Sequence, residues 1–404
     1  MSWEKVKLSN VSTDIQTGPF GSQLHQSDYS ETGTPVVMPK DLINGKISEE
    51  SIARVPSSHV ERLKKHKIKT GDILYSRRGD VGRCAFATVH EENWLCGTGC
   101  LRVTVDELKA NPKFVFYQLQ KAETIGWVVN HAVGATMLNL NTSILSDVPL
   151  ELPDLKTQHR IVDMLSAYDD LIENNQKQIK LLEEAAQRLY KEWFVDLRFP
   201  GHEESKIVDG VPEGWKKVQL GEVFTTVLGG TPSRNKIDYW GGNIPWINSG
   251  AVNNLRIVKE SEFITELGLS NSSTKIMPVH TTVLAITGAT LGQVSYTEIE
   301  VCANQSVVGV YDSKDIYNEF IYLTISNKIK EIISEAMGGA QQHINKDVVN
   351  RFEVVMPDND INKKLKNQIK PLFKKIINLC CDIENLKEAR DRLLPKLMNG
   401  EIEV

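Results

Sequence analysis

The chain has 404 residues, which is enough for two or three domains. Hydrophobic residues make up 41% and charged residues 25%, as in ordinary globular proteins and unlike disordered chains. The formal net charge of −5 argues against a tail-type or histone-like binder of nucleic acid. A local basic surface is still possible, because the total averages over acidic helices.

The cysteines and the N-terminus indicate a compartment. The six cysteines form no C-x-x-C pair and no histidine lies at zinc-finger spacing, so we expect buried, reduced thiols and no metal site. The N-terminus lacks the apolar core of a signal peptide, and no apolar stretch approaches about 18 residues. We therefore expect a cytoplasmic protein without a membrane span.

Residues 1–152 are predicted to form a β-rich domain. Segments rich in Val, Ile and Tyr lie between Gly and Pro turns, which predicts strands at residues 34–39, 72–76 and 100–105. A helix is expected at residues 112–123. The first part of the chain is therefore of mixed α and β content.

The rest of the chain is predicted to continue with a long helix at residues 153–200 and a polar, Pro- and Gly-rich linker at residues 201–214. A second β-rich domain at residues 215–356 and a second long helix at residues 357–404 follow. Within the second domain we expect two strands and one helix, at residues 282–287, 306–311 and 318–336.

The first long helix has the pattern of a coiled coil. No Gly or Pro interrupts residues 154–199, and apolar or small residues recur in alternating steps of three and four, with one polar gap at Asn175. The opposite face is rich in Glu, Lys, Gln and Asp. The residues of this seam are Leu165, Tyr168, Ile172, Ile179, Leu182, Ala186, Leu189 and Trp193.

The chain is a tandem repeat. Eight identities recur 204 positions apart without a gap: Ile172, Asn174, Ile179, Leu182, Glu184, Ala185, Arg188 and Leu189 match Ile376, Asn378, Ile383, Leu386, Glu388, Ala389, Arg392 and Leu393. The β-rich parts repeat 212 positions apart, where Trp3, Lys5, Val6, Leu8 and Val11 match Trp215, Lys217, Val218, Leu220 and Val223. Each copy is therefore one β-rich domain followed by one helix.

The repeat predicts how the copies associate. A seam without a partner would expose Leu and Ile to water, so the simplest partner of each helix is the other helix. A pseudo-twofold axis through the helices would make them antiparallel and place the β-rich domains at opposite ends. Roughly 30 helical residues would separate the domains by about 45 Å, compared with about 34–36 Å for one turn of B-DNA.

Residues 60–83 are the most basic segment, with eight Lys or Arg against three acids. Arg77 and Arg78 follow a predicted strand and enter a Gly turn, where Arg suits bidentate reading of guanine or contact with phosphate. We favour nucleic-acid contact for these two residues and an ordinary solvated face for Lys64, Lys65 and Lys67.

Three polar, Gly-containing loops occur at equivalent places in both copies: residues 17–26 and 229–236, 76–83 and 287–293, and 134–141 and 338–345. Their side chains are of the types that contact base edges, although ordinary turn chemistry is an open alternative. The candidate DNA-binding residues are Phe20, Ser22, Gln23, His25, Lys40, Arg77, Arg78, Arg83, Thr136, Asn141, Ser233, Arg234, Lys236, Thr287, Thr290, Gln293, Gln341, Gln342, His343 and Asn345.

No catalytic residue is expected. Residues 243–246, NIPW, are similar to the [ND]-P-P-[YFW] motif of amino-methyltransferases but lack the second Pro, and no Gly-rich turn upstream could hold S-adenosylmethionine. The PD pairs that contain Asp154 and Asp358 occupy equivalent positions, which predicts helix N-caps rather than a nuclease site. Two alternatives stay open, a self-sufficient methyltransferase or nuclease with a recognition region, and a coiled-coil adaptor that binds protein.

The ordered set of motifs resembles the specificity (S) subunits of bacterial type I restriction-modification systems. The resemblance rests on the two β-rich units, on EWFVDLRFPGHE at residues 192–203, VDGVPEGWKKVQLGEVF at 208–224 and LLPKLMNGEIEV at 393–404, and on the openings TGPFGS and GGTPS. It covers essentially the whole chain.

The resemblance implies an α+β protein with two target-recognition domains, each reading one half of a split DNA site. It implies that the two long helices form an antiparallel coiled coil, set the spacer and bind two methyltransferase subunits, which restriction subunits then join. S-adenosylmethionine, ATP and Mg²⁺ would bind the partners, so this chain would need no cofactor. The residues expected at the coiled-coil and partner interface are Ile172, Ile179, Leu182, Leu189, Trp193, Phe194, Ile376, Ile383, Leu386 and Leu393.

Overall fold

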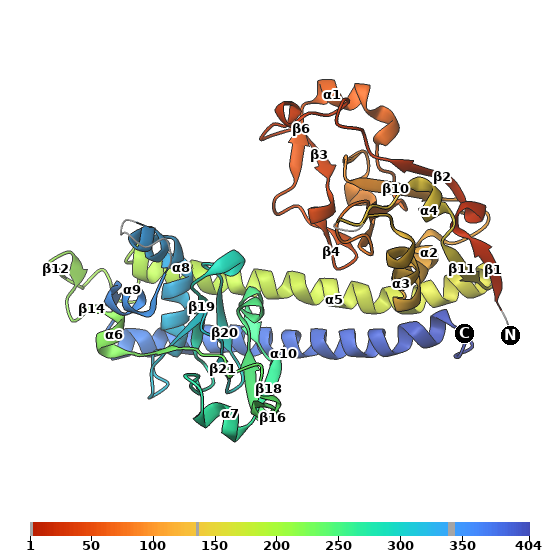
Figure 1. Cartoon of the computed structure of the whole chain (residues 1–404). Coiled ribbons are helices and arrows are strands. Elements are labelled where there is room, and N and C mark those ends of the chain that lie inside the picture. Colours follow the sequence, from red (N-terminus) through yellow and green to blue (C-terminus); the bar gives the residue numbers. More distant parts are fainter. Residues whose placement is uncertain (1–2, 135–136, 338–343) are drawn as a thin grey trace. The chain divides into compact units, whose positions relative to one another are not determined.

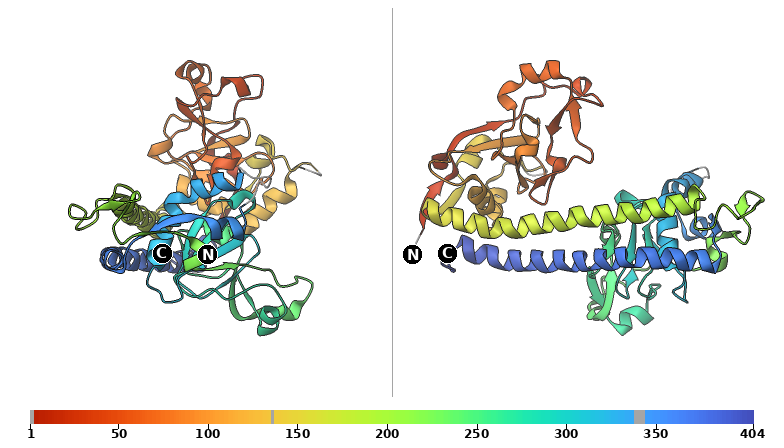
Figure 2. Two further views of the ribbon diagram at one scale, coloured as in Figure 1. Left: turned by 90° about the vertical axis from the view of Figure 1, so that its left-hand side faces the viewer. Right: turned by 180° about the vertical axis from the view of Figure 1, so that it is seen from behind.

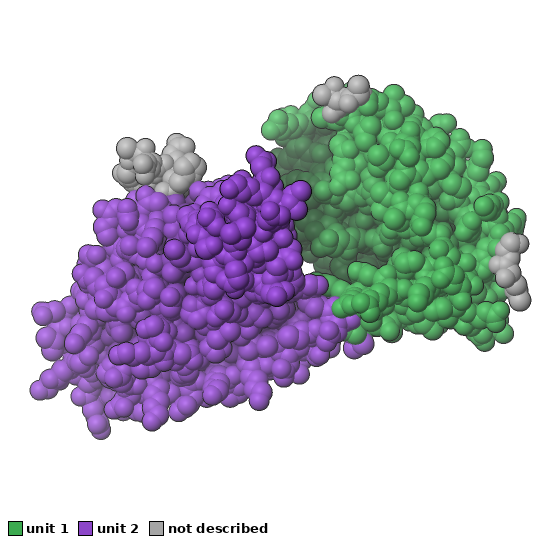
Figure 3. Space-filling model, turned by 60° about the horizontal axis from the view of Figure 1, so that its bottom comes forward, with its two compact units in different colours: residues 1–170, 386–404 green, residues 171–385 purple. Residues whose placement is uncertain are grey.

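The computed structural model describes residues 3–134, 137–337 and 344–404 and divides into two compact units. Unit 1 comprises residues 1–170 and 386–404, and unit 2 comprises residues 171–385 (Figure 3). The two long helices are α5 (Leu155–Tyr190) and α10 (Asn359–Met398) (Figure 1). Unit 1 therefore contains the start of α5 and the end of α10, and unit 2 contains the end of α5 and the start of α10.

Unit 1 is built on a four-stranded sheet in the order β2-β10-β7-β8 and a three-stranded sheet in the order β6-β3-β9. The pairs β1-β11 and β4-β5 complete the strands. Their bounds are β1 Glu4–Lys7, β2 Ser12–Thr17, β3 Thr34–Val37, β4 Leu42–Ile43, β5 Lys46–Ile47, β6 Ala53–Val55, β7 Ile73–Ser76, β8 Cys84–Phe86, β9 Leu95–Cys96, β10 Cys100–Val105 and β11 Pro149–Leu152.

Four short helices cover this part of the chain, α1 Ser57–Arg62, α2 Pro112–Leu119, α3 Ala122–His131 and α4 Thr142–Ser146. The core lies where β10, which is paired on both edges and is almost wholly buried, meets α2. Leu397 and Met398 of α10 belong to the same core. Trp3 and Gly400 also meet, so the N-terminal and C-terminal segments lie side by side in unit 1 (Figure 2).

Unit 2 contains the second set of elements. The strands are β12 Ile207–Val208, β13 Val211–Pro212, β14 Lys216–Gln219, β15 Thr225–Leu228, β16 Trp240–Ile247, β17 Arg256–Ile257, β18 Glu262–Ile264, β19 Thr282–Ala285, β20 Val294–Thr297, β21 Cys302–Ala303, β22 Val307–Tyr311 and β23 Glu353–Met356. The helices are α6 Leu220–Val223, α7 Glu266–Ser270, α8 Asn318–Met337 and α9 Lys346–Arg351.

The strand pairing confirms the repeat. In unit 2 the order β15-β22-β19-β20 reproduces β2-β10-β7-β8, and β18-β16-β21 reproduces β6-β3-β9 with the same antiparallel and parallel partners. The pair β14-β23 likewise corresponds to β1-β11. The two copies therefore share one topology, which sequence identity at scattered positions had predicted.

Most predicted elements are confirmed, but the single helix predicted at residues 112–123 is wrong. The chain leaves the helical conformation at Lys121 and forms α2 and α3. Gln118 donates a hydrogen bond to the carbonyl of Met398, and Lys121 bonds to Asn399 at 2.5 Å. Contacts with the distant end of α10 accompany the break, and local sequence could not have indicated them.

The predicted linker also contains structure. β12 and β13 form a small hairpin, whose turn residues Asp209 and Gly210 have φ values of 52° and 78°. Positive φ at both central positions matches the right-handed twist of paired strands.

The predicted N-caps of both long helices are confirmed. Asp154 accepts the backbone N–H of Thr157 at 3.0 Å, and Asp358 accepts that of Ile361 at 2.8 Å. The first long helix nevertheless ends sooner than residue 200, because the α-helical bonding gives way to a π-turn at Lys191–Val195. In the part of the chain that the structure describes, no helix is long and apolar enough to cross a membrane.

Four of the six cysteines, Cys84, Cys96, Cys100 and Cys302, are buried and free, as predicted. Burial raises the pKa of the Cys84 thiol to about 12, which keeps it protonated and unreactive. The prediction is wrong for Cys381, which is free but exposed on α10, and the neighbouring Cys380 is free but only partly buried.

Candidate nucleic-acid interface

In unit 1 the three predicted loops come together. The guanidinium carbon of Arg77 lies 5.8 Å from the centre of the Phe20 ring, which joins the first loop to the second. The second loop is joined to the third by two backbone hydrogen bonds, from Leu140 to the carbonyl of Arg77 at 2.8 Å and from Gly79 to that of Leu138 at 3.1 Å. Loops that lie far apart in the sequence therefore form one cluster.

The arginines of this cluster differ in how they are held. Arg77 is partly buried, and its Nε has no hydrogen-bond partner in the described structure. Arg78 is exposed, and no described residue forms a hydrogen bond or an ion pair with its guanidinium. Arg83 instead pairs with Asp80 at 3.0 Å. This exposed pair contributes well under about 1 kcal/mol to stability, so it can open without much cost.

The other candidates in unit 1 have mixed environments. Phe20 is 55% exposed, and Gln23 accepts the backbone N–H of Phe20 at 3.2 Å. Lys40 donates to the carbonyl of Ser51 at 2.6 Å, which ties its ammonium to the neighbouring loop. Ser22 and His25 are exposed.

The third loop ends in a helix cap in both copies. Asn141 accepts the backbone N–H of Ile144 at 2.8 Å, and Asn345 accepts that of Val348 at 2.9 Å. The single side-chain oxygen of each Asn therefore already accepts a hydrogen bond within its own domain. The candidates Thr136, Gln341, Gln342 and His343 lie outside the described residues.

In unit 2, the guanidinium of Arg234 is clamped within its own domain. Its two terminal nitrogens donate to the two oxygens of Glu262 at 2.6 and 2.8 Å, and its central carbon lies 3.6 Å from the centre of the Trp240 ring. The hydrogen bonds from Arg234 lower the pKa of the Glu262 carboxyl. Bidentate pairing and a cation–π contact together hold the loop in one conformation.

Local bonds also order the remaining loop residues of unit 2. Lys236 donates to the hydroxyl of Tyr239 at 3.0 Å, and Trp240 donates to the carbonyl of Ser233 at 3.3 Å. In the second loop the hydroxyl of Thr290 lies 3.5 Å from the carbonyl of Thr287. Gln293 is exposed and next to Gly292.

A fourth turn in each unit was missed by the sequence reasoning. In unit 1 it joins β9 to β10 through Gly97, Thr98 and Gly99, and in unit 2 it joins β21 to β22 through Asn304, Gln305 and Ser306. A Cβ on Gly18 of the first loop would lie 1.8 Å from the carbonyl oxygen of Gly97. Only Gly at position 18 allows this approach. The available signal for the turn in unit 1 was its own G-x-G pattern between two apolar strands.

Buried charge fixes the second β-rich domain to both long helices within unit 2. The side chain of Arg256 is fully buried and pairs with Glu183 of α5 at 3.2 Å and with Glu298 at 3.5 Å. Its guanidinium carbon also lies 4.4 Å from the ring centre of Phe373 on α10. Burial raises the pKa of Glu298 to about 7, even though the charge of Arg256 acts in the opposite direction.

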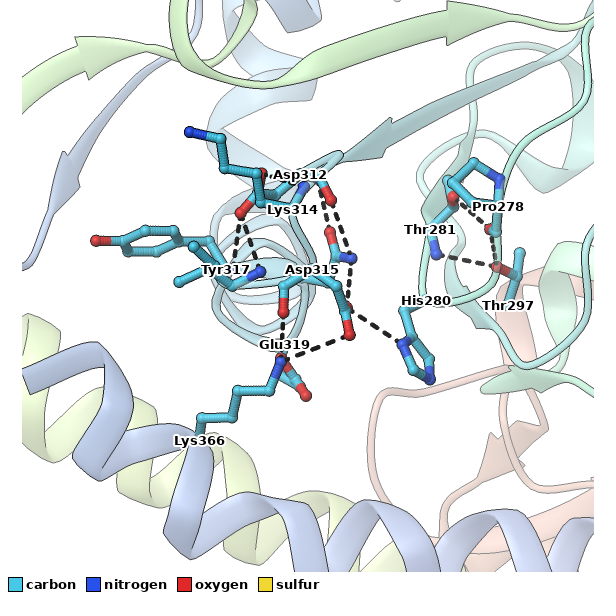
Figure 4. A network of polar contacts seen from close by, with 12 residues as sticks. Pro278, His280, Thr281, Thr297, Asp312, Lys314, Asp315, Tyr317, Glu319 and Lys366 are labelled. Atoms are coloured by element: carbon cyan, nitrogen blue, oxygen red, sulfur yellow. Dashed lines mark hydrogen bonds and ion pairs between the residues drawn. The ribbon is translucent and has the colours of Figure 1, made fainter. Parts of the chain in front are cut away.

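A second polar network ties the same domain to α10 (Figure 4). Lys366 of α10 pairs with Glu319 at 3.2 Å and donates to the carbonyl of Asp315 at 2.6 Å. His280 also contacts the Asp315 carboxylate, at 3.2 Å. Unit 1 uses a different set of residues for the same purpose: Asp169 of α5 accepts from Arg390 of α10 at 2.8 Å and from the hydroxyl of Tyr117 at 2.6 Å.

The predicted seam residues are mostly buried. Ile172, Ile179, Ile376 and Ile383 are between 0% and 7% exposed, while Leu182, Leu189, Leu386 and Leu393 are partly buried. The structure places Phe194 in an aromatic cluster with Trp215 and Phe320 at ring distances of 5.4 and 5.2 Å. Trp193 is buried beside Phe194.

These features define a class of protein, in which two copies of one loop-bearing domain are each joined to a pair of long helices. The described residues contain no group of three or more His, Cys, Asp or Glu placed to hold a metal ion. A family model described as "Type I restriction modification DNA specificity domain" matches residues 2–184 and again 212–389. The chain therefore belongs to this family.

Known relatives span the whole chain. The type I restriction enzyme MjaIX specificity subunit of Methanocaldococcus jannaschii is 27% identical, over 100% of this chain and 94% of the relative. The HindI specificity subunit of Haemophilus influenzae is 25% identical, over 99% of each. The crystal structure of a type I restriction-modification S subunit from M. genitalium has the same fold, with a TM-score of 0.59 at 19% identity and coverage of 98% and 96%.

Proposed function

We propose that the chain is the DNA-recognition subunit of a type I restriction-modification complex. The observation that carries this proposal is the duplicated domain, in which loops with base-reading side chains cluster, in a chain that the specificity-domain model matches twice. Each domain reads one half of a bipartite DNA site. The two halves differ in sequence because the loops share a backbone frame but not their side chains.

The DNA contacts proposed for each domain come from the clustered loops. In the first domain, Arg77, Arg78 and Phe20 are the leading candidates, since Arg pairs with guanine and phosphate, and an exposed aromatic ring stacks or packs on bases and sugars. In the second domain, Thr287, Thr290 and Gln293 are more available than Arg234, because Arg234 would have to leave Glu262 first.

The two long helices are proposed to form an antiparallel coiled coil that sets the spacer between the half-sites. Its support is that each compact unit contains the start of one helix and the end of the other. The buried Ile residues at the predicted seam and the bond between Asp169 and Arg390 add to this support. A pseudo-twofold arrangement would present the two domains to the DNA in opposite orientations.

The helices and nearby surfaces are proposed to bind two methyltransferase subunits, which restriction subunits join. The chain itself is proposed to be non-catalytic, with S-adenosylmethionine, ATP and Mg²⁺ bound by those partners. Two named relatives are specificity subunits of type I restriction enzymes, which supports assembly with subunits of these kinds. Since the complex methylates DNA, its specificity can be measured without cleavage.

The test is methylation mapping by single-molecule sequencing in cells that carry this chain with its methyltransferase subunit. We expect a bipartite motif. Exchange of residues 1–152 for the equivalent domain of another specificity subunit should change only one half of the motif. Exchange of residues 215–356 should change only the other half. If neither exchange changes the motif, or if no motif is found, the result would instead favour the protein-binding adaptor.

A further inference from the structure

The turn between β21 and β22 is a rigid platform in the second domain. Asn304 donates its backbone N–H to the carbonyl of Ile247 at 3.0 Å and accepts that of Val307 at 3.1 Å. The Asn304 side chain also accepts the N–H of Ser306 at 3.1 Å. Because three hydrogen bonds fix so short a turn, the residue at its tip, Gln305, has a defined backbone position.

This turn contacts both of the described recognition loops of its domain. Gly230 of the first loop donates to the carbonyl of Ala303 at 2.8 Å, and Ile286, just before the second loop, donates to that of Ser306 at 2.9 Å. A Cβ on Gly229 would lie 2.1 Å from the carbonyl oxygen of Asn304. The turn therefore borders the first loop and the residue that precedes the second loop.

The side chain of Gln305 is exposed and held at one end. The hydroxyl of Thr231, in the first loop, donates to Oε1 of Gln305 at 2.5 Å. No other described side chain or backbone group forms a hydrogen bond with the Gln305 amide. Both N–H groups of Nε2 are thus available to a ligand, while Thr231 restricts the rotation of the amide.

We propose that Gln305 is a specificity-determining residue that reads a base in the second half-site. This inference rests on the proposed function of the chain. Thr231 engages one lone pair of the amide oxygen, while both N–H donors of Nε2 stay without a partner among the described residues, so the amide best fits a base edge with acceptors. In the major groove, such edges are N7 and O6 of guanine and O4 of thymine. Thr231 is a positioning residue that selects this donor face.

The first domain offers a different side chain at the same place. There the turn is Gly97, Thr98 and Gly99, in which Thr98 is the only side chain beyond hydrogen. Arg77 donates its backbone N–H to the carbonyl of Gly99 at 2.8 Å, so this turn also contacts the second loop of its own domain. Equivalent turns with Gln in one copy and Thr in the other would contribute to two different half-sites.

The experiment uses the chain assembled with its methyltransferase subunit and methylation mapping as the readout. Gln305→Ala should leave the first half of the motif unchanged and relax one position in the second half by about tenfold, as expected for the loss of one base contact. Gln305→Glu keeps an acceptor for Thr231 but replaces the free donors with an acceptor. It should shift that position toward cytosine or adenine, whose amino groups are donors. Thr98→Ala is the matched control, since it should affect only the first half.

The outcomes distinguish a failure of the inference about Gln305 from a failure of the proposed function. If the wild-type complex yields a bipartite motif and both Gln305 variants retain it in full, the inference about Gln305 is overturned and the proposed function stands. Loss of all methylation with both variants would mean that Gln305 is structural, which also overturns the inference. If the wild-type complex yields no bipartite motif, the proposed function fails and the inference fails with it.

Discussion

Single side chains in the loop cluster carry most of the chemistry, and Arg78 is the clearest example. It is exposed, its guanidinium has no hydrogen-bond or ion-pair partner among the described residues, and it adjoins Gly79 and Arg77 on a loop that two backbone hydrogen bonds fix to its neighbour. An exposed guanidinium of this kind gives up no protein partner when it moves from water to a phosphate or a guanine. Arg234 in the other domain shows the opposite case, since both of its terminal nitrogens already donate to Glu262.

Arg78→Ala should weaken recognition in one half-site only, by about 1–3 kcal/mol if the lost contact is bidentate. The measurement is binding of the assembled methyltransferase complex to duplexes that carry changes in either half of its site. Lys64→Ala is the control and should have little effect, because Lys64 belongs to the ordinary solvated face. Equal weakening at both half-sites, or none, would rule out the assigned role of Arg78.

Glu298 gives a prediction about pH. Its pKa is raised from 4.5 to about 7 in the folded protein, so the native state binds a proton that the unfolded state releases between these values. The contribution of Glu298 to the free energy of unfolding is therefore fully present below pH 4.5 and is lost as the pH rises toward 7. Glu298→Gln should raise the melting temperature at pH 8 relative to the parent and have a small effect at pH 5.

The upper limit of this effect is about 3 kcal/mol, because one pKa unit corresponds to about 1.4 kcal/mol. Glu183 continues to balance the charge of Arg256 in the variant, so the buried guanidinium is not left unpaired. Thermal unfolding of the two proteins between pH 5 and 8 would measure the difference. A constant difference across this range would show that Glu298 has an ordinary pKa.

At the scale of elements, residues of the predicted apolar seam are buried at equivalent positions of the two long helices. Ile179 and Ile383 are 7% and 6% exposed and occupy equivalent positions in the two copies. Asn175 is also buried, at 9% exposed, whereas the residue that corresponds to it in the second copy is Leu379. A buried amide in an apolar seam costs stability and can select one register, so the two helices are not interchangeable here.

Ile383→Asp should prevent assembly or lower the melting temperature strongly, because it would bury an unpaired charge at a cost of several kcal/mol. Gln176→Asp, at an exposed position of α5, is the control and should leave both properties almost unchanged. Size-exclusion chromatography with the methyltransferase subunit and thermal unfolding would test this. Normal assembly with an unchanged spacer preference would show that the seam lies elsewhere on the helices.

The elements that periodicity and local chemistry determine were predictable from the sequence. The strand at Cys100–Val105, the N-caps at Asp154 and Asp358 and the duplication all follow from patterns within a few residues or from identity at a fixed offset. Partners that are distant in sequence were not predictable. The clamp of Arg234 on Glu262 and the burial of Arg256 depend on which strands pair, and no local pattern specifies that.

The candidate site was predicted in outline for the same reason. Gly-rich turns after strands marked the three loops, but the sequence did not indicate that all three meet in unit 1. The turn with Gln305 was missed because three polar residues between short strands look like any tight turn. Hydrogen bonds from Gly230 to Ala303 and from Ile286 to Ser306 connect this part of the chain to the first loop and to the residue before the second loop, and no local pattern specifies these bonds.

At the scale of the whole molecule, the last residues of the chain complete the first domain. Leu397 and Met398 are fully buried in the core of unit 1, Gln118 donates to the carbonyl of Met398, and Trp3 packs on Gly400. The C-terminal segment therefore packs in the first recognition domain, although it follows the second domain in the sequence. Damage at the C-terminus should appear as a defect in reading the first half-site.

Leu397→Ala should destabilise unit 1 by about 2–5 kcal/mol, the usual cost of a cavity left by a buried Leu. Hydrogen exchange should increase in β10 and α2 while the β19 and β22 strands of unit 2 stay protected. Lys396→Ala, at the exposed neighbouring position, should change neither. In methylation mapping the Leu397 variant should lose fidelity in the half of the motif that depends on residues 1–152. Loss confined to the other half would mean that the C-terminal helix serves the second domain, against the division of the chain into units.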